Sequence, residues 1–316
     1  MASRFPPSVL TIQKDLKTPY VQQWNFSIQR RLGSARMVEV GYVGSKGTKL
    51  LAGRDFNQPV PNTAALNLRP NFFFGDVTAI ESRANSSYNS LQARFEQRMA
   101  RGLTALVSYT LAKSIDNASN FFASAGDPNF PMDSNNTRLE RGRSSFDARQ
   151  RLSLAYTYDL PGKWLKGWQT NGVWSFQSGR PFTVILNPDL DNSNTGRNFN
   201  GSGGDRPNRV GQGTVSNPSQ SAWFDVKAFT TPKFGSFGNS GRNILDGPGS
   251  ATVNASLLKN IVLKEAMTLQ FRVEAFNLLN RTNFDLPDAV VGSPTFGQVL
   301  SSSAPRHVQL GVKFLF

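Results

Sequence analysis

The chain has 316 residues, a formal net charge of +14, 18% charged residues and a mean hydropathy of −0.36. No run approaches eighteen consecutive apolar residues, which excludes a transmembrane helix. The sequence contains no cysteine and one histidine, His307, which excludes disulfides, thiolate metal sites and histidine-based metal clusters.

The basic residues are spread along the chain instead of being gathered in one block. Nucleic-acid binding usually needs a compact basic patch, so we expect no nucleic-acid partner. Lys and Arg at loops and rims are expected to be solvated or to meet anionic lipopolysaccharide. We also expect no enzyme activity, because an acid–base site of the usual kind would need a histidine partnered by carboxylates. No cofactor is expected.

Alternating apolar and polar residues predict antiparallel β-hairpins. The first hairpin pairs about 20–30 with 37–45 through a short turn that contains Gly33. The second pairs about 88–98 with 103–111. In both hairpins the apolar side chains fall on one face and the polar ones on the other.

Five further strands follow the two hairpins. Pro181 is expected at a bend or a sheet edge within the second of the five, because proline cannot donate a ladder hydrogen bond. The expected strands cover about residues 147–159, 168–186, 250–263, 267–278 and 308–316.

The connections between these nine strands alternate between short turns and long loops. The long loops are expected to be irregular and cover about residues 46–86, 114–145, 187–249 and 279–304. A compact soluble domain rarely contains several structureless loops of this length, whereas bacterial outer-membrane barrels combine short periplasmic turns with long extracellular loops. The pattern therefore predicts an all-β fold, an antiparallel transmembrane β-barrel in the outer membrane of a Gram-negative type bacterium.

The last strand sharpens this prediction. Val308, Leu310, Val312 and Phe314 alternate with polar residues, so we expect an apolar face toward lipid and a polar face toward a wet lumen. If this strand ends in the periplasm, nine strands place the start of the chain outside. Bacterial barrels normally have an even strand number, so we expect at least one strand, and everything before it, to be missing. The first seven residues also lack the features of a signal peptide.

Six stretches, taken in order and spacing, carry a resemblance to a known family. They are Thr18–Ser27, Val40–Gly47, Tyr88–Gln92, Ser108–Ser114, Trp174–Phe182 and Phe271–Asn280. Together they resemble the C-terminal half of TonB-dependent outer-membrane receptors, specifically the Oar-like group common in acidobacteria. The terminal Phe316 resembles the signal by which the barrel-assembly machinery recognises its clients.

The resemblance implies a 22-stranded barrel occluded by an N-terminal plug that contacts the TonB complex. Residues 1–316 would then supply about nine to ten strands of the C-terminal barrel, with the signal peptide, plug and remaining strands absent. The implied function is a fragment of a receptor or transporter for an unknown substrate, in contact with outer-membrane lipid and lipopolysaccharide. Two alternatives stay open: a non-transporting structural or adhesive outer-membrane barrel, and a soluble β-rich binding protein.

The candidate site residues are polar side chains on the predicted lumen face. They would either contact substrate or plug, or be polar simply because the lumen is wet. These residues are Gln92, Arg94, Glu96, Arg98, Gln270, Arg272, Glu274, Gln309 and Lys313.

Two further groups of residues could have either a structural role or a role in ligand binding. Six aromatic residues are expected to form interfacial belts or part of the lipid face rather than to stack on a ligand: Trp24, Tyr42, Tyr109, Trp164, Trp168 and Trp174. Five loop aspartates match no calcium motif and are expected to form Asx turns: Asp127, Asp133, Asp189, Asp191 and Asp205.

Overall fold

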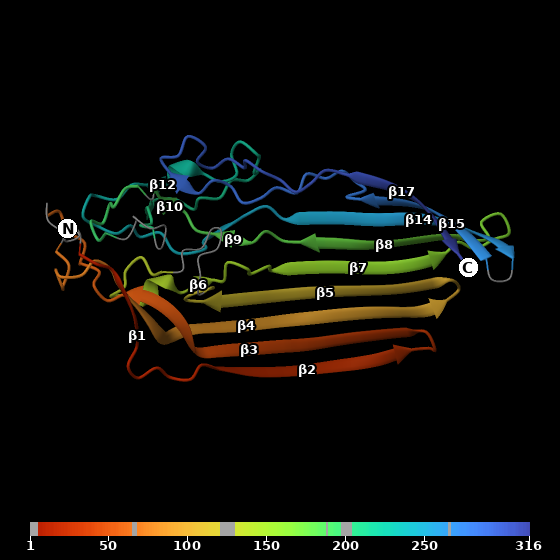
Figure 1. Ribbon diagram of the computed structural model, residues 1–316, viewed down its shortest axis with the longest axis horizontal. Helices are drawn as coiled ribbons and strands as arrows, with labels where there is room; N and C mark the ends of the chain where they lie inside the picture. The colour runs from red at the N-terminus through yellow and green to blue at the C-terminus, as the bar shows by residue number, and fades with distance from the viewer. Residues whose placement is uncertain (1–5, 65–67, 121–129, 188, 197–203, 265–266) are drawn as a thin grey trace.

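A computed structural model describes residues 6–64, 68–120, 130–187, 189–196, 204–264 and 267–316. Its main feature is one large, open β-sheet in which the nine predicted strands lie side by side (Figure 1). The strands are β2 (Tyr20–Leu32), β3 (Arg36–Asp55), β4 (Val77–Ala100), β5 (Leu103–Asp116), β7 (Gln150–Asp159), β8 (Trp168–Gln177), β14 (Ser250–Lys264), β15 (Met267–Phe276) and β17 (His307–Leu315).

Each of these strands runs antiparallel to its neighbours, and the order across the sheet is β17-β15-β14-β8-β7-β5-β4-β3-β2. The chain therefore adds one strand after another, as expected for hairpins joined in sequence. Among the described strands, β2 and β17 each have a single neighbour of this path, so the sheet is not closed.

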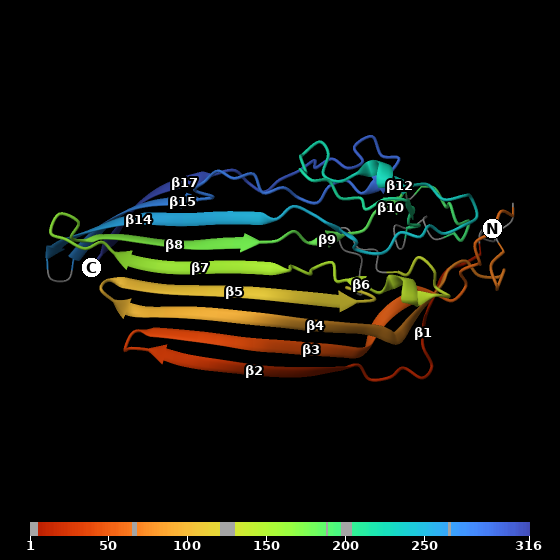
Figure 2. The same cartoon turned by 180° about the vertical axis from the view of Figure 1, so that it is seen from behind.

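The connections sort into two kinds at opposite ends of the sheet (Figures 1 and 2). Short turns and the C-terminus lie at one end, the turn end; long connections lie at the other, the loop end. The β4–β5 turn has two residues between its strands, with positive φ at both Arg101 (53°) and Gly102 (81°). Both central residues of a type I′ turn need positive φ, and this turn suits the twist of paired strands. A Cβ on Gly102 would also lie 2.8 Å from the Asp159 carbonyl oxygen.

Cross-strand pairing places most of the apolar side chains of the nine strands on one continuous face. Directly opposite residues share a face of the sheet, and one such row runs from Phe26 through Tyr42 and Leu91 to Leu111. Many of these side chains are exposed: Phe26 retains 67% of its accessible surface. The apolar face is therefore not covered by any described part of the chain.

Two strands are longer than the sequence predicted. The connection expected to be irregular over 46–86 instead continues the ladder, because β3 extends to Asp55 and β4 begins at Val77. The pairing shifts register between Gly47 and Leu50 and again between Leu50 and Ala52. Such bulges interrupt the alternation, which explains why the sequence pattern missed the extension. A short parallel strand, β1 (Val9–Ile12), adds to β4 here and was not predicted.

The long connections at the loop end are also more ordered than predicted. We call the described parts of 56–76, 117–149, 178–249 and 277–306 the cap. Its short elements are η1 (Thr137–Glu140), β6 (Gly142–Arg143), β9 (Pro181–Phe182), β10 (Ile185–Leu186), β11 (Asn208–Arg209), η3 (Val226–Ala228), β12 (Phe229–Thr230), β13 (Leu245–Asp246) and β16 (Val290–Val291). Pro181 therefore lies outside β8, in a two-residue strand paired with β13.

Within the described residues, the structure contains no helix that is both long and apolar enough to span a membrane.

Candidate functional site

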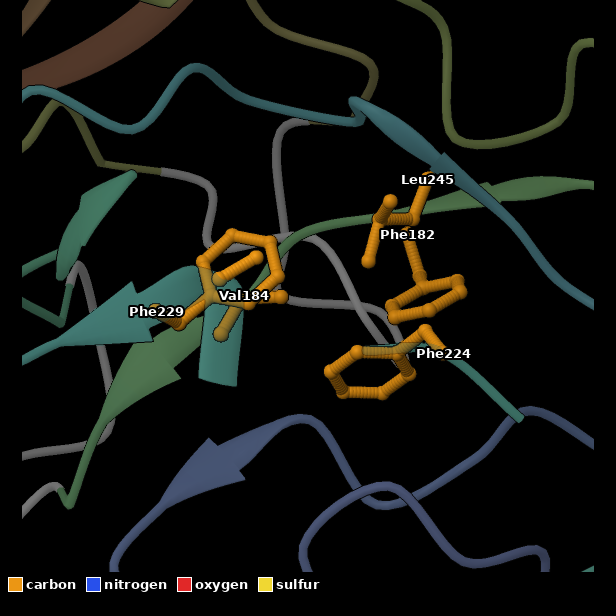
Figure 3. Close-up of a cluster of buried hydrophobic side chains, with 6 residues drawn as sticks. Phe182, Val184, Phe224, Phe229 and Leu245 are labelled. Atoms are coloured by element: carbon orange, nitrogen blue, oxygen red, sulfur yellow. The ribbon is translucent and has the colours of Figure 1, made fainter. Parts of the chain in front are cut away.

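The cap has its own hydrophobic core (Figure 3). Phe224 lies at its centre, with ring centroids 5.6 Å from Phe182, 5.9 Å from Phe229 and 5.2 Å from Phe296. Phe182 is 1% exposed and Leu245 2% exposed. These residues come from two different long connections. The core therefore holds the two connections together as one packed unit.

A buried ion pair joins two of the connections. The Arg206 guanidinium donates a hydrogen bond from Nη1 to Glu140 Oε2 (2.7 Å) and from Nε to the Ser240 carbonyl oxygen (2.9 Å). Glu140 Oε1 accepts a hydrogen bond from the Met132 backbone N–H (3.0 Å). Both charged side chains are almost fully buried. Removing one partner of such a pair leaves an uncompensated buried charge, so the pair fixes these loops relative to each other.

A second buried pair ties the cap to the sheet. The Arg242 guanidinium pairs with Asp116 at the end of β5 and donates from Nε to the Glu140 carbonyl oxygen (2.9 Å).

A further buried carboxylate in the cap is Asp205, which accepts a hydrogen bond from the Ser193 backbone N–H (2.7 Å). Burial raises the pKa of Asp205 to about 6, and the nearby Asp191 carboxylate adds to the rise.

The β3–β4 connection is held rigidly at its base. The Asn57 side chain donates to the carbonyl oxygens of Asn71, Phe74 and Gly75 and accepts from the Asn71 backbone N–H. The Arg69 guanidinium adds ion pairs to Asp55 and Asp76.

This rigid connection presents an exposed aromatic pair. Phe72 and Phe73 are 71% and 68% exposed, and their ring centroids lie 4.1 Å apart. An exposed aromatic pair on a fixed base is a surface suited to contact with a partner, because little conformational entropy is lost on binding.

The predicted site residues of the second hairpin share the polar face of the sheet. Gln92 and Arg94 lie opposite Gly41 and Glu39 on this face. Arg94 pairs with Glu96 (3.1 Å), and Glu96 pairs with Arg98 (3.0 Å). These charges therefore compensate one another along β4.

The other predicted site residues lie on the same face, on β15 and β17. Gln270 lies opposite Lys313, and Glu274 lies opposite Gln309. Arg272 pairs with Glu274 (2.5 Å). The structure thus places the nine residues in two groups, separated by the strands between β4 and β15.

An apolar patch between the two groups was not predicted. A hollow of about 500 Å³ on the polar face is lined by Leu106, Ala155, Val173 and Phe276, among others. The first three form one cross-strand row. The alternation in each strand could have revealed them, since Leu106 and Val173 occupy positions in phase with polar residues.

The six aromatic residues considered above are placed as follows. Four lie in the rows of the apolar face, namely Trp24, Tyr42, Tyr109 and Trp174. Trp168 lies in the same phase near the turn end, with Lys259 Nζ 5.3 Å from its ring centroid. Trp164 lies in the β7–β8 turn and is 96% exposed.

Two of the predicted loop aspartates form local turn hydrogen bonds. Asp133 accepts from the Asn135 N–H (2.8 Å), and Asp191 accepts from the Thr195 N–H (2.9 Å). The backbone N–H of Asp189 donates to Asn187 Oδ1 (3.0 Å). Asp127 lies outside the described residues. No group of three potential metal ligands occurs in the described part of the chain.

An antiparallel sheet with an uncovered apolar face, short turns at one end and packed loops at the other defines the wall of an outer-membrane barrel. The family model of the outer membrane beta barrel domain matches residues 1–309, so the chain belongs to this family and is located in the outer membrane. The loop end is then the extracellular end. No curated protein matches the sequence.

Solved structures with a similar fold include two outer-membrane proteins. One is the outer membrane transporter YddB from Escherichia coli, with 13% identity, a TM-score of 0.55, and coverage of 98% of this chain and 34% of that chain. Another is the ferripyoverdine receptor of Pseudomonas aeruginosa bound to ferripyoverdine, with 10% identity, a TM-score of 0.51, and coverage of 95% and 27%. The chain thus spans about a third or less of the length of these structures.

Proposed function

We propose that the chain forms part of the wall and of the extracellular binding surface of a TonB-dependent, Oar-like receptor. Such a receptor would take up or bind a substrate too large or too scarce for porins. The observation that carries the proposal is the cap: two of the long connections share one core, and two buried ion pairs join a third connection to them and the cap to the sheet. A preorganised surface loses less entropy on binding than mobile loops would, which favours a role in ligand capture.

In this proposal, residues 1–316 are the C-terminal part of the barrel domain of a longer protein. The plug, the remaining strands and the signal peptide lie elsewhere in that protein, and the TonB complex is contacted only through the plug. The polar groups around Arg94 and Arg272 line a wet lumen. The apolar hollow at Leu106 and Phe276 would contact the plug, because exposed apolar area on a lumen wall is stabilised when a partner covers it.

The remaining partners follow from location. The barrel-assembly machinery would recognise the terminal Phe316, and outer-membrane lipid with lipopolysaccharide would surround the apolar face. We propose no enzyme activity and no nucleic-acid partner.

The genomic sequence directly upstream of Met1 tests the transport role. We expect an open frame, continuous with this chain, that encodes further strands preceded by a plug and a TonB-contacting segment. A signal peptide that leads directly into a single further strand would contradict transport and would identify a small, non-transporting barrel.

A non-transporting adhesive barrel is the second candidate, favoured by the exposed Phe72–Phe73 pair. It predicts that cells producing the protein aggregate, and that the Phe72→Ser/Phe73→Ser double variant sediments at the rate of cells without the protein. Phe234→Ser is a matched control, because Phe234 is also exposed, at 54%. Equal sedimentation of the wild type and the double variant would eliminate this candidate.

A further inference from the structure

A group of basic side chains lines a hollow at the extracellular rim of the sheet. The hollow measures about 520 Å³ and is lined by Lys113, Ile115, Arg141, Gly142, Arg143, Arg149 and Asp246. Four of these seven residues are cationic and one is anionic. The hollow therefore attracts anions.

The cross-strand register places three residues of this hollow, Lys113, Ile115 and Arg143, on the outer, apolar side of the wall. Lys113 is two residues beyond Leu111, and Ile115 is four beyond it, so all three are in phase along β5. Arg143 lies directly opposite Ile115 in the β5–β6 pair. Lys46 continues the same row, because it pairs with Ser87, which in turn pairs with Ile115.

Three of the cations have no internal partner. The side chains of Lys113, Arg141 and Arg149 make no hydrogen bond or ion pair within the described part of the chain. Arg143 is compensated by Asp147 (2.8 Å) and Asp246 (2.5 Å), although its buried Nη2 has no hydrogen-bond partner among the described residues. The hollow thus keeps a net positive charge. Elsewhere in the cap, the buried Arg206 and Arg242 are neutralised by carboxylates of the same chain.

The surface next to the hollow is apolar and aromatic. Leu111 lies two residues closer to the turn end than Lys113, and it pairs with Leu91, which pairs with Tyr42. Trp24 lies in the cross-strand row of Lys113, because it pairs with Gly44, which pairs with Asn89, and it is 43% exposed. A ligand that fits both surfaces must carry an anionic head and a hydrocarbon tail, with the tail directed toward the middle of the membrane.

We propose that the hollow binds a phosphate group of an outer-leaflet glycolipid of the lipopolysaccharide type. Arg guanidinium groups bind phosphate through paired, charge-assisted hydrogen bonds, and Lys adds a point charge. The acyl chains would lie along the row that contains Leu111. The proposal depends on the outer-membrane location of the chain and not on transport.

Binding of lipid A to the full chain in detergent tests the proposal. Lipid A with both phosphates, dephosphorylated lipid A and inorganic phosphate are compared by titration with a fluorescent lipid. The test variant is Lys113→Gln/Arg141→Gln/Arg149→Gln. The control is Arg101→Gln/Lys163→Gln/Lys166→Gln, which removes the same charge from exposed positions at the turn end.

We expect the test variant to bind phosphorylated lipid A at least about tenfold more weakly than the wild type, while the control stays within about twofold. The wild type should lose a similar factor when the lipid is dephosphorylated. The variant Lys113→Arg/Arg141→Lys/Arg149→Lys should retain binding, which separates loss of charge from loss of fold.

Three results would overturn the proposal. They are equal binding of lipid A by the test variant and the wild type, equal binding of both lipids by the wild type, and displacement of the lipid by equimolar inorganic phosphate. The last result would identify a site for a free anion.

Discussion

The sheet and the cap use apolar side chains in opposite ways. In the sheet, Phe26 and Leu310 keep 67% and 75% of their surface exposed on the outer face. In the cap, Phe182 and Phe224 are buried against one another. The sheet therefore gains hydrophobic stabilisation only when lipid or detergent covers it, whereas the cap carries a core of its own. We expect the two regions to respond to different perturbations.

The largest effect is expected from removing one partner of the buried ion pair in the cap. Glu140→Ala leaves the Arg206 guanidinium buried without its carboxylate, which should cost about 3–5 kcal/mol. Hydrogen exchange should show faster exchange in the cap and unchanged protection in β3 to β5. The matched control, Arg138→Ala, removes a charge from the same 3₁₀ helix at an exposed position.

The double variant Glu140→Leu/Arg206→Met sharpens this test, since replacing both partners by apolar groups should recover most of the loss. Equal exchange in wild type and Glu140→Ala would show that the cap does not depend on this pair.

The sheet should respond to a charge on its outer face. Leu154 lies between Val107 and Trp174 in the middle of the apolar rows, and Leu154→Arg should cost about 2–4 kcal/mol in a bilayer. Ser153→Arg is the matched control, because the neighbouring residue points to the lumen face. Urea titration of the protein in lipid vesicles measures both. Equal costs for the two variants would mean that the faces are assigned incorrectly.

The smallest effect is expected from pH. Because the pKa of Asp205 is raised to about 6 in the folded cap, protonation favours the folded state. The stabilisation of the folded state by protonated Asp205 is fully present below the ordinary carboxyl pKa of 3.8. It is lost as pH rises through about 6, the pKa of Asp205 in the folded cap. The cap of the wild type should therefore lose about 1–3 kcal/mol between pH 4 and 7 relative to Asp205→Asn. Identical pH profiles of the two proteins, measured by hydrogen exchange, would contradict the raised pKa.

The sheet was predictable from the sequence and the cap was not, for a physical reason. Each strand carries its own period-two signal, so all nine strands and their faces followed from local patterns such as Val308 to Phe314. The cap core joins Phe182, Phe224 and Leu245, which are far apart in the chain; Phe224 and Leu245 belong to no periodic segment, and Phe182 was expected in the strand over 168–186. Its ion pairs are equally non-local, since Arg206 and Glu140 lie in different connections. The aromatic residues in these polar loops were the available sign of a core.

The length of β4 has a consequence for what the protein meets first outside the cell. A tilted strand crosses the hydrocarbon layer in about 9–11 residues, whereas β4 has 24. With about 3.3 Å per residue, the upper part of the β3–β4 hairpin extends well beyond the membrane surface. The Phe72–Phe73 pair lies in the connection beyond the ends of β3 and β4 and is therefore held away from the lipid surface.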